Sequence, residues 1–443
     1  MPRSMRPSPA AVTGSVLPPR LRCRTACRRT MYRRTAYRPD ATTRRSPDVG
    51  RPMEGSRMAP GVEDEDRVGG IAAAPRRRSL LFYTHAVTGG GAERVWALLA
   101  SALAARGHAV TLAYDHEANG PEAGLDPRVR LLALGRNHAV AVARLARHLA
   151  RDRPDVSLSA LGVSNLKHAV AAGLAGRRRH AVLSFHGHPQ SEPQRLSRLG
   201  NAATPVLARL TARSVFVSDG LMAHYVAAVG AVPGRSVRLH NPVEVDAAVP
   251  ARDAAELRAR PRRVLAVGRL APAKDFSTLL RAFALVRPDA ELVLVGEGPE
   301  RPALEALIRD LGLSARVTLA GHVERPWQLY REAACFAASS RAEAFGNVLV
   351  EALAHGLPVA STACDGPVEI LEGGRFGALV PVGDAAALAA AIDGMLDEPG
   401  PPAPRVARAA LFSVAAAVAG YEALFDGLLD GLLDGFLDGP ARP

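Results

Sequence analysis

The sequence predicts an α/β protein made of two Rossmann-like domains in tandem. The chain has 443 residues, 48% of them hydrophobic, which is enough for two separate cores. From residue 79 onward, short apolar runs alternate with helix-like segments, a pattern typical of parallel sheets. The same pattern starts again near residue 263. Because such sheets bind ligands outside the carboxyl ends of their strands, we expect a central cleft between the two domains.

The first series defines an N-terminal domain over residues 76–245. A glycine-rich loop at Gly89, Gly90 and Gly91 follows its first strand, and a helix from 92 to 106 ends at Gly107. We expect strands at residues 80–87, 109–115, 129–134, 156–160, 180–185 and 214–218.

The second series defines a C-terminal domain over residues 246–400. We expect strands at residues 263–268, 291–295, 316–319, 335–338 and 358–361, and helices near 275–287, 301–311 and 347–355. An extension over 401–443 holds a last helix near 405–425, which we expect to pack back across the first domain. It ends in a repeat in which a glycine follows each of Asp426, Asp430, Asp434 and Asp438. Since each glycine costs a helix about 1 kcal/mol relative to alanine, we interpret this repeat as a frayed extension and not as a site.

The positive charge of the chain gathers at its N-terminus. The formal net charge is +13, but residues 1–79 hold 18 arginines and only seven acidic residues, so the remainder is nearly neutral. A basic domain face for nucleic acid is therefore not expected. Residues 1–75 are rich in Arg, Pro, Ser and Thr without an apolar period, and we predict that they are disordered. They are either a transit peptide or an over-extended reading frame that truly starts at Met53 or Met58. We favour the second interpretation.

Cysteine and hydropathy patterns indicate a cytoplasmic protein. Cys23 and Cys27 lie in the tail, and Cys335 and Cys364 lie in apolar segments, so neither a disulfide framework nor a zinc site is expected. No run of 18 apolar residues is present. Arginines flank an apolar stretch over residues 202–210, which allows peripheral contact with the inner membrane, although an ordinary amphipathic core helix is the preferred interpretation. These arginines are Arg195, Arg198, Arg209 and Arg213.

The segment most informative about chemistry is residues 339–358, SSRAEAFGNVLVEALAHGLP. A helix that starts near Gly346 or Asn347 offers free backbone N–H groups to a phosphate. Glu343 precedes this helix and can accept hydrogen bonds from sugar hydroxyls. Glu351 lies in its second turn, facing inward. Two solvated surface charges are the alternative, but the helix is apolar on most sides, so a buried Glu351 needs a polar partner such as a ribose.

This segment resembles the retaining glycosyltransferases of family 4, whose E-x7-E motif is matched by Glu343 and Glu351, including the intervening step Phe345, Gly346 and Asn347. Arg269 and Lys274 resemble the basic pair that this family uses for the donor diphosphate, and Gly296 and Gly298 resemble its nucleotide-side turn. The similarity continues through residues 365–371 and 377–384, and it covers roughly 262–384. It implies the GT-B architecture, with an acceptor-binding domain followed by a donor-binding domain.

Two features of the N-terminal half fit the same resemblance. It implies that the loop at residues 89–91 lines the cleft near the transferred sugar. The rival is a dinucleotide-binding loop, supported by Asp115 at the end of the second strand but opposed by Arg94 in place of the third glycine. His186, just after a strand, resembles the cleft histidine of the family, with a solvated loop histidine as the alternative. Residues 218–220 and 240–242 resemble structural landmarks that close the first domain.

The resemblance implies transfer of a sugar, with retention of configuration, from a nucleotide-sugar donor, often uridine-linked. The implied acceptor is a polysaccharide, a lipopolysaccharide core or a lipid-linked glycan. Glu343 and His186 would be catalytic, and no cofactor is expected. The D-x-D triplet at Asp64 and Asp66 lies in the tail, so we expect no metal, with Arg269 and Lys274 supplying the charge. The alternatives are a nucleotide-sugar epimerase, a glucan phosphorylase with a lysine-bound pyridoxal phosphate, and a non-enzymatic sugar-binding module.

Overall fold

The computed structural model describes residues 76–86, 91–116, 125–189 and 195–437, with side chains from 198 to 431 in the last range. The predictions for the N-terminal tail, for Cys23 and Cys27, for the acidic triplet at 64–66 and for Gly89 and Gly90 fall outside these residues. The described residues all belong to one compact unit.

The first sheet is parallel and has the strand order β3-β2-β1-β4-β5-β6-β7. Its strands are β1 (Ser79–Ala86), β2 (Ala109–His116), β3 (Arg130–Ala133), β4 (Val156–Ala160), β5 (Ala181–Phe185), β6 (Arg213–Phe216) and β7 (Ser236–Arg238). The six expected strands are confirmed. The sequence missed β7, because three residues at a partly exposed edge are too few to show a period.

The second sheet is also parallel, with the order β10-β9-β8-β11-β12-β13. Its strands are β8 (Arg263–Val267), β9 (Glu291–Val295), β10 (Val317–Gly321), β11 (Cys335–Ala338), β12 (Val359–Thr362) and β13 (Ala378–Val380). The five expected strands are confirmed, and β13 is a further strand. The prediction of two tandem Rossmann-like sheets is therefore correct.

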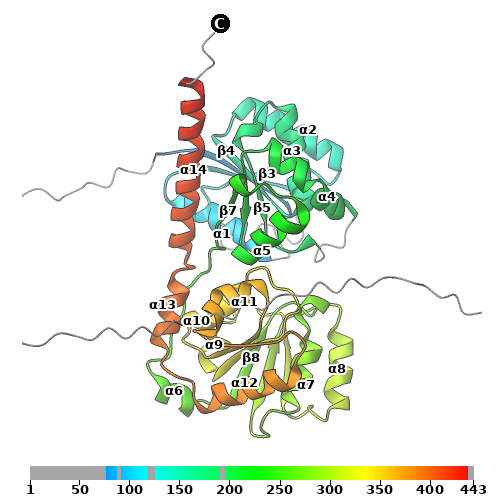
Figure 1. Ribbon diagram of the computed structural model, residues 1–443, viewed down its shortest axis with the longest axis vertical. Helices are drawn as coiled ribbons and strands as arrows, with labels where there is room; N and C mark the ends of the chain where they lie inside the picture. The colour runs from blue at the N-terminus through cyan, green and yellow to red at the C-terminus, as the bar shows by residue number, and fades with distance from the viewer. Residues whose placement is uncertain (1–75, 87–90, 117–124, 190–194, 438–443) are drawn as a thin grey trace, which may run out of the picture. The chain divides into compact units, whose positions relative to one another are not determined.

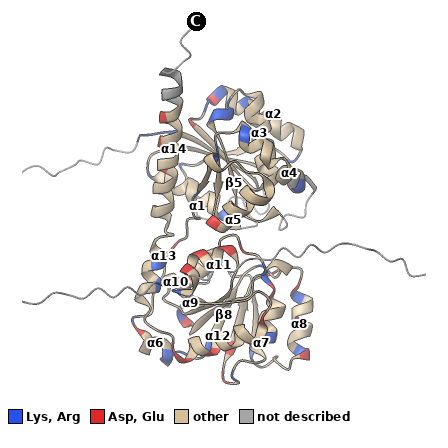
Figure 2. Ribbon diagram, in the orientation of Figure 1, with Lys and Arg blue, Asp and Glu red and all other residues tan. Residues whose placement is uncertain are grey.

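Helices cover both faces of each sheet (Figure 1). Those of the first half are α1 (Gly91–Ala105), α2 (His138–Asp152), α3 (Gly162–Leu174), α4 (Arg195–Leu210) and α5 (Asp219–His224). Those that follow are α6 (Ala254–Ala259), α7 (Phe276–Phe283), α8 (Arg301–Asp310), α9 (Trp327–Glu332), α10 (Asn347–Ala354), α11 (Asp365–Ile370), α12 (Ala385–Asp397), α13 (Ala403–Ala410) and α14 (Val414–Leu437). Figure 2 shows mainly Lys and Arg on α2, α3 and α4, and Asp and Glu on α11 and α12.

The last helix corrects one prediction. The described part of the Asp-Gly repeat is helical and not frayed, because Gly427 and Gly431 lie inside α14, which continues to Leu437. Tyr421, Phe425 and Leu428 are buried on one face of this helix and join the core that α1 forms with the first sheet. Burial of this apolar stripe offsets the helix penalty of the glycines, each about 1 kcal/mol. The sequence placed the helix near 405–425, whereas the structure divides that region into α13 and α14.

The strand orders fix where ligands can approach. In the first sheet the order reverses between β1 and β4, and in the second sheet between β8 and β11. The loops leaving the two strands at such a point run in opposite directions, which opens a crevice outside the carboxyl ends of the strands. Each sheet therefore has one switch point, and the residues that follow these four strands are the first candidates for a site.

Candidate active site

The loop after β8, at the switch point of the second sheet, is locked against the loop after the neighbouring strand β9. Gly268 N donates to Val295 O over 2.9 Å, and Leu270 N donates to Glu297 O over 2.9 Å, so the loops after β8 and β9 run against each other. A Cβ at Gly296, whose φ is 144°, would lie 1.9 Å from the Gly268 carbonyl oxygen. A Cβ at Gly298 would lie 2.3 Å from the carbonyl oxygen of Leu270. Both glycines are thus required by close backbone approach.

Lys274 and Glu343 form an ion pair at this switch point. Lys274 ends a 3-10 turn over Pro272–Lys274, and its carbonyl oxygen accepts a hydrogen bond of 2.9 Å from Ser339 Oγ. Ser340 Oγ donates to Glu343 Oε2 over 3.3 Å. The loop after β11 is therefore held against the loop after β8, and it brings together two residues that the sequence placed 69 positions apart.

Arg269 is exposed and lies in the loop that follows β8, the same loop that leads to Lys274. Among the described residues no carboxylate lies within ion-pair distance of its guanidinium. Its charge is therefore available to an anionic ligand at the carboxyl edge of the sheet.

The step between the two glutamates serves mainly to position α10. Gly346 precedes the helix with a φ of 104°, a conformation that favours glycine. The ring of Phe345 is buried and lies 5.5 Å from the His240 ring, so it contributes to the core and not to an exposed surface. Asn347 Oδ1 accepts a hydrogen bond of 3.0 Å from Asn241 Nδ2, which follows β7.

Glu351 is buried on α10 and has a polar partner within the protein. Tyr330 OH of α9 donates to Glu351 Oε2 over 2.8 Å. Burial raises the pKa of Glu351, and the hydrogen bond from Tyr330 opposes this shift. From the sequence, we expected Glu351 to need a polar partner such as a ribose. Tyr330 was not predicted as this partner, because nothing in the local pattern connects α9 to the second turn of α10.

His186 follows β5 of the first sheet and is half-buried. Its Nε2 lies 3.0 Å from Ser184 Oγ, and its ring meets the Trp96 ring edge-on at 5.2 Å between centroids. Burial lowers the pKa of His186 to about 4, against the opposing effect of Asn241. The imidazole is therefore neutral at pH 7, with one ring nitrogen that donates a hydrogen bond and one that accepts. Of the predicted glycine loop, the structure describes Gly91, which begins α1.

Helix α11, which follows β12, contacts the loops of the first sheet. His188 Nε2 lies 3.0 Å from Asp365 Oδ2, and Glu369 accepts hydrogen bonds of 2.6 Å from Asp219 N and from the His240 ring. The sequence interpreted residues 218–220 and 240–242 as structural landmarks. The structure gives them a carboxylate partner that sequence reasoning missed.

Asp115, the residue that supported a dinucleotide site, is engaged inside the protein. Its buried carboxylate accepts hydrogen bonds from Lys167 Nζ over 2.6 Å and from Tyr83 OH over 3.0 Å. It also lies 2.7 Å from His85 Nδ1. This carboxylate is therefore not free to bind a ribose, which argues against the dinucleotide interpretation.

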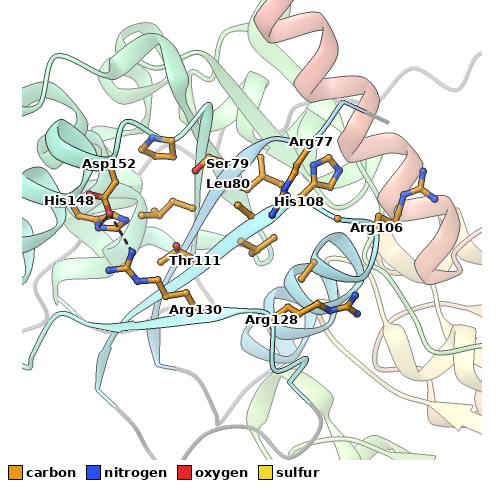
Figure 3. Close-up of a pocket in the computed structure, with 16 residues that line it drawn as sticks. Arg77, Ser79, Leu80, Arg106, His108, Thr111, Arg128, Arg130, His148 and Asp152 are labelled. Atoms are coloured by element: carbon orange, nitrogen blue, oxygen red, sulfur yellow. Dashed lines mark ion pairs between the residues drawn. The ribbon is translucent and has the colours of Figure 1, made fainter. Parts of the chain in front are cut away.

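A cavity of about 750 Å³ lies at the opposite edge of the first sheet (Figure 3). It is lined by residues at the amino ends of β1, β2 and β3 and at the carboxyl ends of α1 and α2. Several of its basic residues have acidic partners: Arg130 lies 3.5 Å and His148 3.0 Å from Asp152, and Arg106 pairs with Glu422 at 2.8 Å. Helix carboxyl ends repel anions, so this cavity is not the site for a nucleoside diphosphate.

Two family models match the chain. The one described as Glycosyltransferase Family 4 matches residues 89–247, around the first sheet. The one described as Glycosyl transferases group 1 matches residues 261–398, around the second. No helix among the described residues combines the length and apolar character needed to cross a membrane.

Curated proteins show similarity over shorter stretches. The lipopolysaccharide core biosynthesis glycosyltransferase LpsE of Rhizobium meliloti is 39% identical over 130 residues, 29% of this chain and 38% of the relative. A D-inositol 3-phosphate glycosyltransferase of Mycobacterium sp. is 38% identical over 197 residues, 41% of this chain and 44% of the relative. The chain thus matches about two fifths of the length of these relatives.

Solved structures share the fold over most of the chain. Anabaena HepE in complex with UDP has a TM-score of 0.66 at 20% identity, covering 79% of this chain and 100% of that one. Sucrose-phosphate synthase of Thermosynechococcus elongatus has a TM-score of 0.66 at 23% identity, covering 80% and 100%. Family models match the regions of both sheets and solved structures share their arrangement, so the chain has the GT-B fold, with a stretch matched by the Glycosyltransferase Family 4 model followed by one matched by the Glycosyl transferases group 1 model.

Proposed function

We propose that this protein transfers a sugar, with retention of configuration and without a metal, from a nucleotide-diphosphate donor to a glycan or lipid-linked acceptor. The observation that carries the proposal is the ion pair of Lys274 and Glu343 at the switch point of the second sheet, with the exposed Arg269 in the same loop as Lys274. Three charged residues thus follow the strands of this switch point, and close glycine contacts hold the loop that carries Arg269 and Lys274. This arrangement suits a ligand that carries both a diphosphate and a sugar.

The two cations account for departure of the leaving group. As the bond between the anomeric carbon and the phosphate oxygen breaks, negative charge grows on the diphosphate. Arg269 can bind it with two parallel hydrogen bonds, and Lys274 can stabilise it as a point charge. Because Lys274 is paired with Glu343 in the free protein, donor binding exchanges one anionic partner for another. This exchange leaves Glu343 free to accept hydrogen bonds from sugar hydroxyls.

In the transfer step, no protein side chain has to gain or lose a proton. A neutral His186 can hydrogen-bond a sugar hydroxyl without adding charge near an oxocarbenium-like centre. The acceptor oxygen then bonds to the anomeric carbon on the face that the diphosphate leaves, and the acceptor proton passes to the departing phosphate oxygen. No covalent intermediate with the protein is part of this scheme.

The relatives suggest the class of donor and acceptor. Several solved structures of similar fold contain UDP, including those of Anabaena HepE. LpsE is named for lipopolysaccharide core biosynthesis. A Campylobacter jejuni relative, 35% identical over 136 residues, is named for transfer to a diphospho-undecaprenol-linked glycan. We therefore favour a uridine-linked donor and a lipopolysaccharide or lipid-linked acceptor.

The direct test measures nucleoside diphosphate released by the purified full chain, with a panel of nucleotide sugars and the acceptor candidates, in the presence of EDTA. We expect release with one donor, and a product whose anomeric configuration by NMR matches that of the donor. An inverted product would overturn retention, and activity restored only by a divalent cation would overturn metal independence. An epimerised donor without a glycosidic product would favour the epimerase alternative.

We also propose that the outer surface of α3 and α4, beside the first sheet, contacts an anionic membrane. Leu199 and Val206 of α4 are 57% and 58% exposed, and Leu174 of the adjacent α3 is 72% exposed. The interpretation as an ordinary amphipathic core helix accounts for the buried residues of α4 but not for these three exposed apolar residues. Exposed arginines beside them, Arg198 and Arg209, suit anionic lipid head groups.

Co-sedimentation with vesicles containing phosphatidylglycerol tests this contact. We expect binding by the wild type, and at least a fivefold loss when Leu199 and Val206 are both replaced by serine. The matched control replaces Leu285 and Leu411, exposed leucines on other elements, by serine. Equal loss in both double variants would contradict the assignment of this face.

A further inference from the structure

Three histidines gather at the switch point of the first sheet, and the scheme above does not use them. His85 and His116 lie at the carboxyl ends of the paired strands β1 and β2, with 4.6 Å between their ring centroids. His138, the first residue of α2, has its ring centroid 6.1 Å from that of His85. We call these three residues the histidine cluster.

The acidic residue beside the cluster is neutralised from several sides. The Asp115 side chain is fully buried, and Lys167 of α3, Tyr83 and His85 all contact its carboxylate. Although burial raises the pKa of Asp115, hydrogen bonds from His85, Lys167 and Tyr83 outweigh burial and hold that pKa below its usual range. Asp115 therefore stays ionised, but its charge is balanced by Lys167 and does not repel an approaching anion.

Apart from Asp115, the ionisable groups that act on His116 and His138 are basic. Burial lowers the pKa of His116, and the charges of His85 and Arg136 lower it further. Burial also lowers the pKa of His138, with additional effects from Lys167 and His85. Helix α2 has no acidic residue in its first turn and directs its positive end at His138. Apart from Asp115, the charged groups on β1, β2, α2, α3 and the loop before α2 that face the cluster are thus positive.

We propose that the histidine cluster, with Arg136, binds an anionic phosphate group on the acceptor. The proposal rests on the proposed transferase function and names the acceptor class. His186 stands at the carboxyl edge of the same sheet, directly after β5, which is two strands from β1 and three from β2. At about 4.8 Å per strand, the cluster lies roughly 10–15 Å from it. Trp96 links the two places, because its Nε1 donates to Tyr83 O over 3.2 Å and its ring meets His186.

The spacing fits an acceptor whose phosphate lies on one part and whose reacting hydroxyl lies one or two sugar lengths away. Binding the phosphate at the cluster would orient that hydroxyl toward the transferred sugar, in the way that remote binding groups position a substrate. A sugar phosphate and the head group of a phosphorylated lipid both offer this chemistry.

The first experiment measures binding of inorganic phosphate and of sulfate to the full chain by calorimetry, in the Lys274→Ala background so that the donor site contributes less. We expect binding of both anions, and at least a tenfold weaker affinity when His116 and His138 are both replaced by glutamine. The control is His148→Gln, which changes a histidine in the cavity at the opposite edge of the sheet. Unchanged affinity in the double variant, or equal loss in the control, would overturn the proposal.

Sulfate also tests the role of protonation, because it stays dianionic across the range used. A bound dianion raises the pKa values of His116 and His138, so binding takes up protons and the affinity for sulfate increases as the pH falls from 8 to 6. The double glutamine variant should lose this pH dependence. A pH-independent affinity in the wild type would contradict the involvement of the histidines.

Two competitors distinguish the source of the phosphate. Displacement of sulfate by soluble glycerol 3-phosphate assigns a phosphate ester in solution, and displacement by vesicles containing phosphatidic acid assigns a lipid head group. Displacement by neither would overturn the proposal. The outcome is independent of the transferase test, since anion binding is measured without donor. If the protein binds sulfate but releases no nucleoside diphosphate from any donor, the proposed transferase function is wrong while the anion site stands.

Discussion

At the residue scale, the chemistry depends on a few charges that the fold brings together. Lys274 and Glu343 are distant in sequence, yet they pair because the loops after β8 and β11 leave adjacent strands on the two sides of a switch point. A sequence reader can select both residues, as motif and charge did here. The pairing itself depends on strand order, which local patterns do not reveal.

Replacing Glu343 by glutamine tests its role. We expect kcat to fall about 100-fold or more, because the amide accepts fewer hydrogen bonds from sugar hydroxyls and leaves Lys274 without its carboxylate. Thermal stability should change little, since the pair is partly solvated. The matched control is Glu305→Gln, which changes a carboxylate paired with Arg301 on α8. Turnover within twofold of wild type in Glu343→Gln would remove this residue from the mechanism.

At the element scale, glycines decide whether the loops of the second sheet can meet. Gly296→Ala would place a Cβ 1.9 Å from the Gly268 carbonyl oxygen. We expect a lower melting temperature, together with weaker binding of nucleoside diphosphate. The control is Gly394→Ala, inside α12, where a Cβ meets nothing within 4 Å. It should stabilise the protein by up to about 1 kcal/mol. Calorimetry on both variants checks the difference, and equal stability would contradict the close-approach argument.

Helix α14 gives a second prediction at this scale. The Phe425 side chain is fully buried and shares a cluster with Trp96 and Leu99 of α1. Phe425→Ala should lower the free energy of unfolding by about 3–5 kcal/mol, because it leaves a cavity. Leu411→Ala, at a residue that is 58% exposed, should change it by less than about 0.5 kcal/mol. Urea denaturation would measure both, and a similar small effect in each variant would mean that α14 does not stabilise the first domain.

At the scale of the whole molecule, a buried histidine should make the protein sensitive to acid. The His168 ring contacts Ser157 Oγ at 2.8 Å and Ser159 Oγ at 2.9 Å, and burial lowers its pKa to about 3. Because the unfolded chain takes up this proton near pH 6.5, stability is full above that pH. It then decreases by about 1.4 kcal/mol for each pH unit as the pH falls toward 3.

His168→Gln should reduce the pH dependence of the free energy of unfolding by up to the contribution of one proton, about 1.4 kcal/mol per pH unit, even if the variant is less stable at pH 7. His322→Gln, at an exposed residue, should leave the slope unchanged. Denaturation curves between pH 7 and 4.5 measure both slopes. An identical slope in His168→Gln would show that this histidine does not control acid stability.

The two sets of alternating strands and helices were predictable because buried parallel strands and the helices that cover them appear in the sequence as apolar runs with turn residues between them. The short strands β7 and β13 were not, and the sequence predicted the last helix but ended it near residue 425, because the stability of these parts comes from neighbours distant in the chain. For the candidate site, motifs selected residues such as Glu351 and His186. They could not supply Tyr330 as the partner of Glu351, or Trp96 as the neighbour of His186.

By itself, the sequence determined the type of each domain, the family resemblance and the charged residues proposed for the donor site, since these depend on composition and spacing along the chain. Only the tertiary structure decided that Lys167 balances Asp115, that three histidines meet at the end of the first sheet, and that the Asp-Gly repeat is helical as far as Leu437. The physical reason is that buried charge and helix packing are settled by contacts between segments far apart in sequence, whose energies outweigh local preferences.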